Sequence, residues 1–299
     1  MKFLHSLSLN VSFLGIFLSF FSFYRIAPIS AEISPDISIG IDSKLDALEL
    51  PFPILEEDTS GVCSSQIEPS INKIIQRPEL NKGKWAILVQ SLDGTNIYSL
   101  NPDSYMVPAS NVKLLVTAAA LQKLDLNGQI RSTSITDWIK VTNLKSDNAY
   151  ASVLLSYLGG SQSVQQELTD LGIDAKGYRL RDGSGLSRNN LATPRTLVST
   201  LRAMYHARGN DVFLASLPVA GISGTLRNRL RHTLAEGSVR AKTGTLKGVK
   251  ALSGYINHPE YGVLVFSIIT NQPTSQSNNS VVKGIDGIVL QLSTLINCQ

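Results

Sequence analysis

Residues 238–270 read SVRAKTGTLKGVKALSGYINHPEYGVLVFSIIT. Three stretches within them, near 238–242, 249–257 and 262–270, have the composition of strands. The last contains a nearly continuous apolar run, 264–269, which is typical of a strand covered on both faces. This part of the chain therefore predicts a sheet with packing on each side.

The order of the other elements extends this prediction to the whole fold. A hairpin is expected over 85–100, where Asp93-Gly94 supplies the turn. Helical spacing or capping signals predict further helices at 64–76, 110–124, 134–141, 149–158, 164–171, 193–204 and 278–296. This order predicts an α+β fold, in which the terminal helices cover one face of an antiparallel sheet and a helical block covers the other.

The chain divides into three parts. Residues 1–31 carry Lys2, Arg25 and a long apolar run but no acid, so they predict an export signal cleaved after Ala31, or else an uncleaved membrane anchor. Residues 32–60 are acidic and contain prolines, which is typical of a solvated linker. Residues 61–299 are then the folded domain, expected to be exported to the periplasm or cell envelope, with membrane contact only through an uncleaved N-terminal segment.

Composition excludes several classes of protein. With 43% hydrophobic and 17% charged residues, the 299-residue chain can bury a core. A formal charge of +4 is too weak to predict nucleic-acid binding. The sequence has no phosphate-binding loop and no C-x-x-C, and its four histidines are scattered, so no metal and no cofactor are expected. It also lacks G-x-S-x-G, which weakens the case for a Ser-His-Asp hydrolase.

The two cysteines lie next to the predicted terminal helices. Cys63 precedes the first helix and Cys298 follows the last. Because these helices are expected side by side, an oxidising compartment would allow a Cys63–Cys298 bridge. Two free thiols are the alternative.

Three short motifs carry the chemistry: Ser110-x-x-Lys113, Ser146-Asp147-Asn148 and Lys242-Thr243-Gly244-Thr245. Each alone is a weak signal, and only K-T-G occurs once. S-x-x-K also occurs at Ser70/Lys73 and Ser280/Lys283, and S-x-N at Ser8/Asn10, Ser187/Asn189 and Ser277/Asn279. Ser110 follows Pro108-Ala109 and opens a buried helix, whereas Ser70 and Ser280 lie on amphipathic helices, so Ser110 is the predicted nucleophile.

The chemistry requires an activated hydroxyl. Residues three apart share a helix face, so Lys113 can reach the Ser110 hydroxyl. Burial, the helix N-terminus and the neighbouring Lys242 all disfavour a charged Lys113, which could then act as a neutral base. Lys242 is expected to stay charged and to attract an anionic substrate end. The alternative for Lys113 is a surface lysine.

The remaining motif residues are expected to bind and to relay protons. Ser146 can pass a proton between a lysine and the leaving group, and the Asn148 amide can hold a substrate peptide bond. Gly244 would let substrate backbone lie along the strand edge. The Thr243 and Thr245 hydroxyls could bind a carboxylate, and the backbone N–H groups of Ser110 and Thr245 would form an oxyanion hole.

Five stretches together resemble one enzyme family: PASNVKLL (108–115), VTNLKSDNAYA (141–151), RDGSGLSRNNLATP (181–194), LPVAGISGTLRNRLR (217–231) and VRAKTGTLKGVKALSGYI (239–256). Over roughly 64–296 the chain resembles the D-alanyl-D-alanine carboxypeptidase/endopeptidase family, the class C penicillin-binding proteins. The resemblance implies a penicillin-recognising serine peptidase fold and an acyl-enzyme on the matching serine, Ser110. It also implies peptidoglycan stem peptides as substrates and β-lactams as acylating inhibitors.

One departure separates this chain from the family. Only residues 114–145 lie between Lys113 and Ser146, where the family usually carries inserted domains, so a short form with a more open cleft is expected. A β-lactamase is one alternative, but the class A device E-x-x-x-N is missing, since Glu167 is followed at the fourth place by Leu171. A catalytically inactive cell-wall-binding homologue is another, against which the three intact motifs argue.

Two further stretches are open to more than one interpretation. Residues 182–188, DGSGLSR, suit a tight structural loop better than direct catalysis. Arg227, Arg229, Arg231 and His232 form a basic run that indicates a solvated helix face, with attraction to anionic cell-wall polymer as the alternative.

Overall fold

The computed structural model of this chain describes residues 61–275 and 277–298. The predicted export signal and acidic linker, residues 1–60, lie outside them. Within the described residues, no helix is both long and apolar enough to cross a membrane.

A five-stranded antiparallel sheet forms the centre of this part of the chain. Its strand order is β3-β2-β10-β9-β8. The strands are β2 (Lys84–Ser91), β3 (Asn96–Leu100), β8 (Val239–Leu246), β9 (Val249–His258) and β10 (Gly262–Asn271). The predicted hairpin and the three predicted strands are thus confirmed, and β8 runs to Leu246, beyond its predicted end. Strand β8 lies at the sheet edge, so one side of its backbone is available to another chain.

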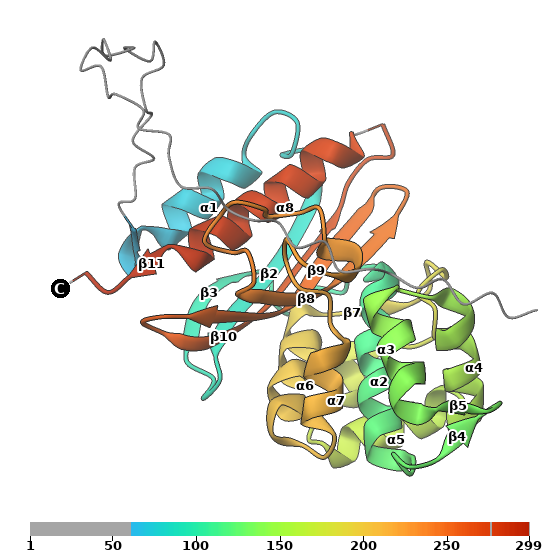
Figure 1. The fold of residues 1–299 in the computed structure, drawn as a ribbon. Helices are drawn as coiled ribbons and strands as arrows, with labels where there is room; N and C mark the ends of the chain where they lie inside the picture. Colours follow the sequence, from blue (N-terminus) through green and yellow to red (C-terminus); the bar gives the residue numbers. More distant parts are fainter. Residues whose placement is uncertain (1–60, 276, 299) are drawn as a thin grey trace, which may run out of the picture. The chain divides into compact units, whose positions relative to one another are not determined.

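Helices cover both faces of the sheet, as predicted. On one face, α1 (Ile67–Ile75) and α8 (Asn278–Ser293) lie side by side (Figure 1). Their apolar side chains pack with those of β9 and β10, as Ile71 and Ile285 do. The last helix ends before the predicted boundary, since Leu295–Ile296 instead forms β11, which pairs with β1 (Val62–Cys63).

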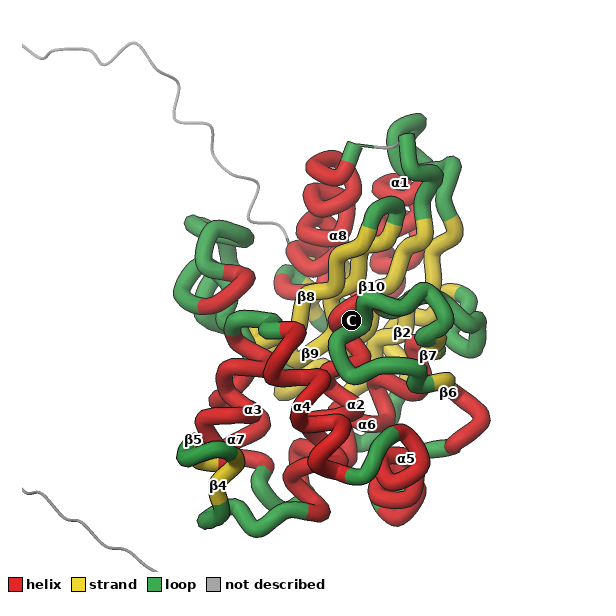
Figure 2. Tube along the Cα trace, turned by 90° about the vertical axis from the view of Figure 1, so that its right-hand side faces the viewer, coloured by secondary structure: helices red, strands yellow, loops and turns green. Residues whose placement is uncertain are grey.

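The helical block occupies the other face and lies below the strands in Figure 2. It comprises α2 (Val112–Lys123), α3 (Ile135–Leu144), α4 (Asn148–Leu158), α5 (Ser161–Asp170), α6 (Pro194–His206) and α7 (Asn210–Ser216). Helix α2 packs against α3, α4, α5 and α6. It is therefore apolar on nearly all sides, as its sequence indicates. Helix α7 and the small hairpins β4–β5 (Gln129–Ile130, Thr133–Ser134) and β6–β7 (Tyr178–Arg179, Leu191–Ala192) were not predicted.

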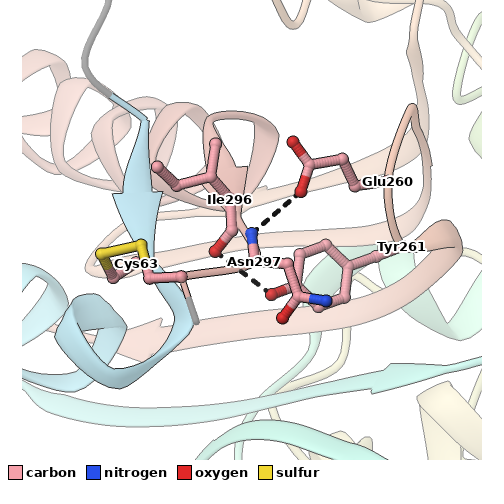
Figure 3. Close-up of a disulfide and its surroundings, with 6 residues drawn as sticks. Cys63, Glu260, Tyr261, Ile296 and Asn297 are labelled. Atoms are coloured by element: carbon pink, nitrogen blue, oxygen red, sulfur yellow. Dashed lines mark hydrogen bonds between the residues drawn. A yellow bond between two sulfur atoms is a disulfide. The ribbon is translucent and has the colours of Figure 1, made fainter.

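A disulfide joins Cys63 to Cys298, beside the β1–β11 pair (Figure 3). The β9–β10 turn packs on the same segment: the backbone N–H of Asn297 donates to the Glu260 carboxylate at 2.8 Å, and the Tyr261 hydroxyl donates to the carbonyl of Ile296 at 3.3 Å. The bridge closes a loop with a sequence separation of 235 residues, so in the chain-entropy account it strongly restricts the unfolded chain.

Candidate active site

The turn that carries Ser110 is held between the helical block and the sheet. Ser110 lies in a short 3₁₀ helix, Ala109–Asn111, immediately before α2. The buried Asn111 amide donates to the Ser253 hydroxyl of β9 at 2.7 Å. A Cβ on Gly244 of β8 would lie 2.7 Å from the carbonyl oxygen of Pro108, so only glycine allows this close approach. The K-T-G strand is thereby packed directly against the nucleophile turn. This contact accounts for Gly244, whose expected role toward a substrate stays a prediction.

Ser110 and Lys113 are in contact, as the three-residue spacing predicts. The Lys113 amine donates to the Ser110 hydroxyl at 2.9 Å and to Asn148 Oδ1 at 2.8 Å. A third hydrogen bond goes to the carbonyl of Ser184. The Lys113 side chain is fully buried, which excludes the alternative of a surface lysine. Its nitrogen therefore lies where it can exchange a proton with Ser110.

The S-D-N motif forms the start of α4. The Asp147 carboxylate caps this helix by accepting the backbone N–H of Tyr150 at 2.9 Å, which places Asn148 at the first helical position. Ser146 precedes the cap with φ of 57°, a left-handed conformation that is strained for a non-glycine residue. The Ser146 hydroxyl accepts a hydrogen bond from the Lys242 amine at 2.7 Å. The three motifs, far apart in sequence, thus form one connected group.

Lys113 and Lys242 are both buried, and burial lowers the pKa of each amine. Burial lowers the pKa of Lys113 to about 8, while the carboxylates of Asp182 and Asp147 act in the opposite direction. Burial, and then the charge of Lys113, lowers the pKa of Lys242 well below its ordinary value. The Lys242 amine donates to neutral groups, the Ser146 hydroxyl and the carbonyl of Thr243 at 3.0 Å. Burial is thus the main cause of the lowered pKa of both lysines, and the expectation that Lys242 stays charged stays a prediction.

The open edge of β8 forms one wall of the site. The segment before it covers this edge as far as Ala241, whose backbone N–H donates to the carbonyl of Pro218 at 2.9 Å. Backbone groups alternate along an antiparallel strand, so those of Thr243 and Thr245 point to the same side as that of Ala241, away from β9. Both threonines line the adjacent cavity. The edge is thus oriented to accept an extended peptide.

A cavity of about 430 Å³ joins these groups. Its lining contains Ser110, Ser146, Asn148, Thr243 and Thr245, together with residues that were not predicted to line the site: Gly185, Leu186, Thr225, Arg229, Leu246 and Val282. The first five of these lie in the quoted stretches 181–194, 217–231 and 239–256, which could have indicated them. All of the lining residues are described, and none is a carboxylate.

Arg229 corrects the interpretation of the basic run as a helix face. Residues 227–232 follow a single 3₁₀ turn, Gly224–Leu226, and form turns rather than a helix. The Arg229 guanidinium contacts both Asp286 carboxylate oxygens, with distances from 2.6 to 3.3 Å, and both side chains are 18% exposed. The pair connects this segment to α8 at the cavity wall. Arg227, Arg231 and His232 remain exposed.

A half-buried serine and a fully buried lysine at the start of a helical block, facing a K-T-G strand at a sheet edge, define the penicillin-recognising serine hydrolase fold. Residues 67–137 and 128–292 match the D-Ala-D-Ala carboxypeptidase 3 (S13) family, and the chain belongs to this family. The two matched stretches overlap within residues 114–145, the segment that is expected to be short.

Characterised relatives support the assignment. The chain is 46% identical over 142 residues to a D-alanyl-D-alanine carboxypeptidase of Actinomadura sp. (strain R39), covering 42% of this chain and 26% of the relative. It is 32% identical over 241 residues to penicillin-sensitive carboxypeptidase A of Dictyostelium discoideum, covering 73% and 46%. The aligned part therefore spans less than half of the length of these relatives.

Solved structures show the same fold. Penicillin-binding protein 4 (dacB) of Haemophilus influenzae superposes with a TM-score of 0.64 at 15% identity, covering 75% of this chain and 99% of that one. The TLA-3 extended-spectrum β-lactamase gives a TM-score of 0.65 at 19% identity, covering 77% and 98%. Because both identities are low, these likenesses establish the fold and leave the activity to be argued from the site.

Proposed function

We propose that this chain is a serine-type D-Ala-D-Ala carboxypeptidase that acts on peptidoglycan stem peptides through an acyl-enzyme on Ser110. One observation carries the proposal: Lys113 and Lys242 each contact a serine hydroxyl, Ser110 and Ser146, at one cavity beside an open strand edge. Cutting of cross-links, an endopeptidase activity, would use the same groups. Family membership and the named carboxypeptidase relatives support the choice of substrate.

In acylation, neutral Lys113 takes the Ser110 proton as the hydroxyl oxygen bonds to the penultimate D-alanine carbonyl carbon. The backbone N–H groups of Ser110 and Thr245 would stabilise the resulting oxyanion. The C–N bond to the terminal D-alanine then breaks. Ser146, whose oxygen accepts from Lys242, donates its own proton to the leaving amine and regains one from the lysines.

Substrate binding would combine the edge of β8 with Asn148 and Lys242. An extended stem peptide would pair with the β8 edge at Thr243 and Thr245, and the Asn148 amide would bond its backbone. The terminal carboxylate would lie at the two threonine hydroxyls. An anion there would favour the charged form of the nearby Lys242, which is the role expected of that lysine.

Water then hydrolyses the acyl-enzyme, and a β-lactam would acylate Ser110 in the same way. The absence of a carboxylate from the cavity lining favours a peptidase over a β-lactamase, because rapid β-lactam turnover needs a base to activate water. Glu167 lies on α5, 4.0 Å from Lys123, and does not line the cavity. A stable penicilloyl-enzyme is therefore expected.

Such a substrate lies outside the cytoplasm. We therefore propose export to the periplasm or cell envelope, with residues 1–31 as the signal. No part of this proposal requires a metal, a cofactor or nucleic acid.

The test is acylation and product release by the purified chain. Fluorescent penicillin should label the wild-type protein, and a D-Ala-D-Ala-terminated pentapeptide should release D-alanine. Ser110→Ala should abolish both while preserving the circular-dichroism spectrum. Ser70→Ala is the matched control, since it alters the S-x-x-K motif of α1 and should change neither. Labelling that persists in Ser110→Ala would refute the choice of nucleophile, and rapid release of hydrolysed penicillin would favour a β-lactamase.

A further inference from the structure

The loop of residues 182–190 is organised by one carboxylate. Asp182 accepts the Ser184 hydroxyl and the backbone N–H of Gly185 on one oxygen, both at 2.7 Å. Its other oxygen accepts the backbone N–H of Ser187 at 2.8 Å and the Asn190 amide at 3.2 Å. Four donors from four residues converge on one half-buried side chain, so its loss would release the whole turn.

This turn presents one backbone carbonyl to the catalytic pair. The carbonyl of Ser184 accepts a hydrogen bond from Lys113 and a longer one, at 3.4 Å, from the Ser110 hydroxyl. The next residue fixes the distance between the loop and the nucleophile turn. A Cβ on Gly185 would lie 2.2 Å from the carbonyl oxygen of Ala109, and the Gly185 φ of 87° is one that glycine adopts without strain. The loop is thus pressed against the backbone that carries Ser110.

The hydrogen bond from Lys113 to the Ser184 carbonyl matters for the reaction because a neutral amine has few N–H groups to donate. A neutral amine has two N–H donors and one lone pair. The charged form of Lys113 can donate one N–H to each of three oxygens, Ser184 O, Asn148 Oδ1 and Ser110 Oγ, and the neutral form must give up one of these donations. If the first two occupy both N–H groups, the lone pair can only point at the third, which is where a base must receive the proton. Without Ser184 O, an N–H could turn toward Ser110 and the pair would be unproductive.

We propose that Asp182 is a positioning residue for acylation: by organising the loop, it holds the Ser184 carbonyl where it directs the Lys113 lone pair at Ser110. This inference rests on the proposed function, and it assigns Asp182 no contact with the substrate.

The negative charge of Asp182 also raises the pKa of Lys113, which lowers the neutral fraction of that lysine. This effect on the acylation rate is opposite to that of positioning, so an experiment can separate the two. The charged groups that act on Lys113 are Asp182 and Asp147, which raise its pKa, while the charge of Lys113 itself lowers the pKa of the neighbouring Lys242. Removing the Asp182 charge alone therefore moves the pKa of Lys113 further down and increases the neutral fraction at pH 7. A loss of rate at pH 7 would then occur despite more neutral base being available. The weaker basicity of that base accounts for less than the pKa change itself, and the rest of the loss comes from orientation.

The experiment measures acylation by fluorescent penicillin across pH 6–10 for wild type, Asp182→Asn and Asp174→Asn. Asparagine places an amide donor where Asp182 accepts from Ser187 and Asn190. In Asp182→Asn we expect the plateau rate constant at high pH to fall roughly tenfold to a hundredfold. The acid limb, in which the rate constant rises with pH as Lys113 loses its proton, should move to lower pH. Asp174→Asn makes the same change in another aspartate-capped turn, where the side chain accepts the Lys176 N–H, and should match wild type.

Ser184→Ala provides a second variant in case Asp182→Asn fails to fold. It removes one hydrogen bond to Asp182 but keeps the carboxylate, so the plateau should fall several-fold, by about 3 to 10 times, with no movement of the acid limb. A structural role alone would lower the fraction of protein that labels while leaving the plateau rate constant unchanged. That result, or wild-type rates in either folded variant, would overturn the inference. An unlabelled wild type would instead refute the proposed function itself.

Discussion

Raising the pH from 7 to 9 should accelerate acylation of Ser110 about tenfold. Only neutral Lys113 can accept the serine proton, and burial lowers the pKa of this lysine to about 8. The neutral fraction is then about 0.1 at pH 7 and about 0.9 at pH 9. With an unperturbed lysine pKa of about 10.4, the neutral fraction would be below about 0.001 at pH 7.

The second-order rate constant is the appropriate measurement, because at low penicillin concentration it reports groups of the free protein. Rapid-quench labelling over pH 6–10 should give a rising limb with a midpoint near 8. Circular dichroism at each pH checks that the fold is retained. Lys113→Ala is the control: its rate should be lower by about 10² to 10⁴ and should lack this limb.

Two results would refute the reasoning. A flat profile in the wild type would mean that the proton goes elsewhere than to Lys113. A midpoint near 10.5 would mean that burial does not destabilise the lysine charge, and the neutral-base account would then fail.

Two stability predictions follow from the same structure. Replacing both Cys63 and Cys298 by serine removes a loop closure worth roughly 5 kcal/mol in the chain-entropy account. The melting temperature should therefore fall by roughly 10 °C. Reductant should lower the melting temperature of the wild type to the same value and leave that of the variant unchanged. Lys242→Met replaces a fully buried amine by an apolar side chain, so the melting temperature should rise by about 2 to 4 °C while acylation is lost, whereas the same change at the exposed Lys123 should have little effect. A large loss of stability in Lys242→Met would mean that its hydrogen bonds outweigh the cost of burial.

Much of the fold could be predicted because its signals are local. The apolar run of β10, the Asp93-Gly94 turn of the hairpin and the Thr193-Pro194 start of α6 each depend on neighbours a few residues away. Elements without such signals were missed. Helix α7 has seven residues and begins after Gly209 with no side-chain cap, and β8 extends past its predicted end because its last pairs, such as Thr245 with Lys250, are made with β9.

The site was predictable only in part, because only some of its contacts join residues that are close in the sequence. Ser110 and Lys113 lie one helical turn apart, so the sequence by itself determined their contact, and with it which chemistry to expect. The choice of Ser110 over Ser70 rested on the Pro108-Ala109 context and the buried helix, whereas only the structure shows that Ser110 shares a cavity with Ser146, which Lys242 contacts.

The tertiary structure alone decided what lies around that pair. It placed the Ser184 carbonyl against Lys113, the Arg229–Asp286 pair at the cavity wall, and Lys242 out of contact with water. These contacts join residues that are from 57 to more than 70 positions apart, or depend on the depth of burial. Periodicity and spacing describe a single element, whereas distance and desolvation arise only when separate elements pack together.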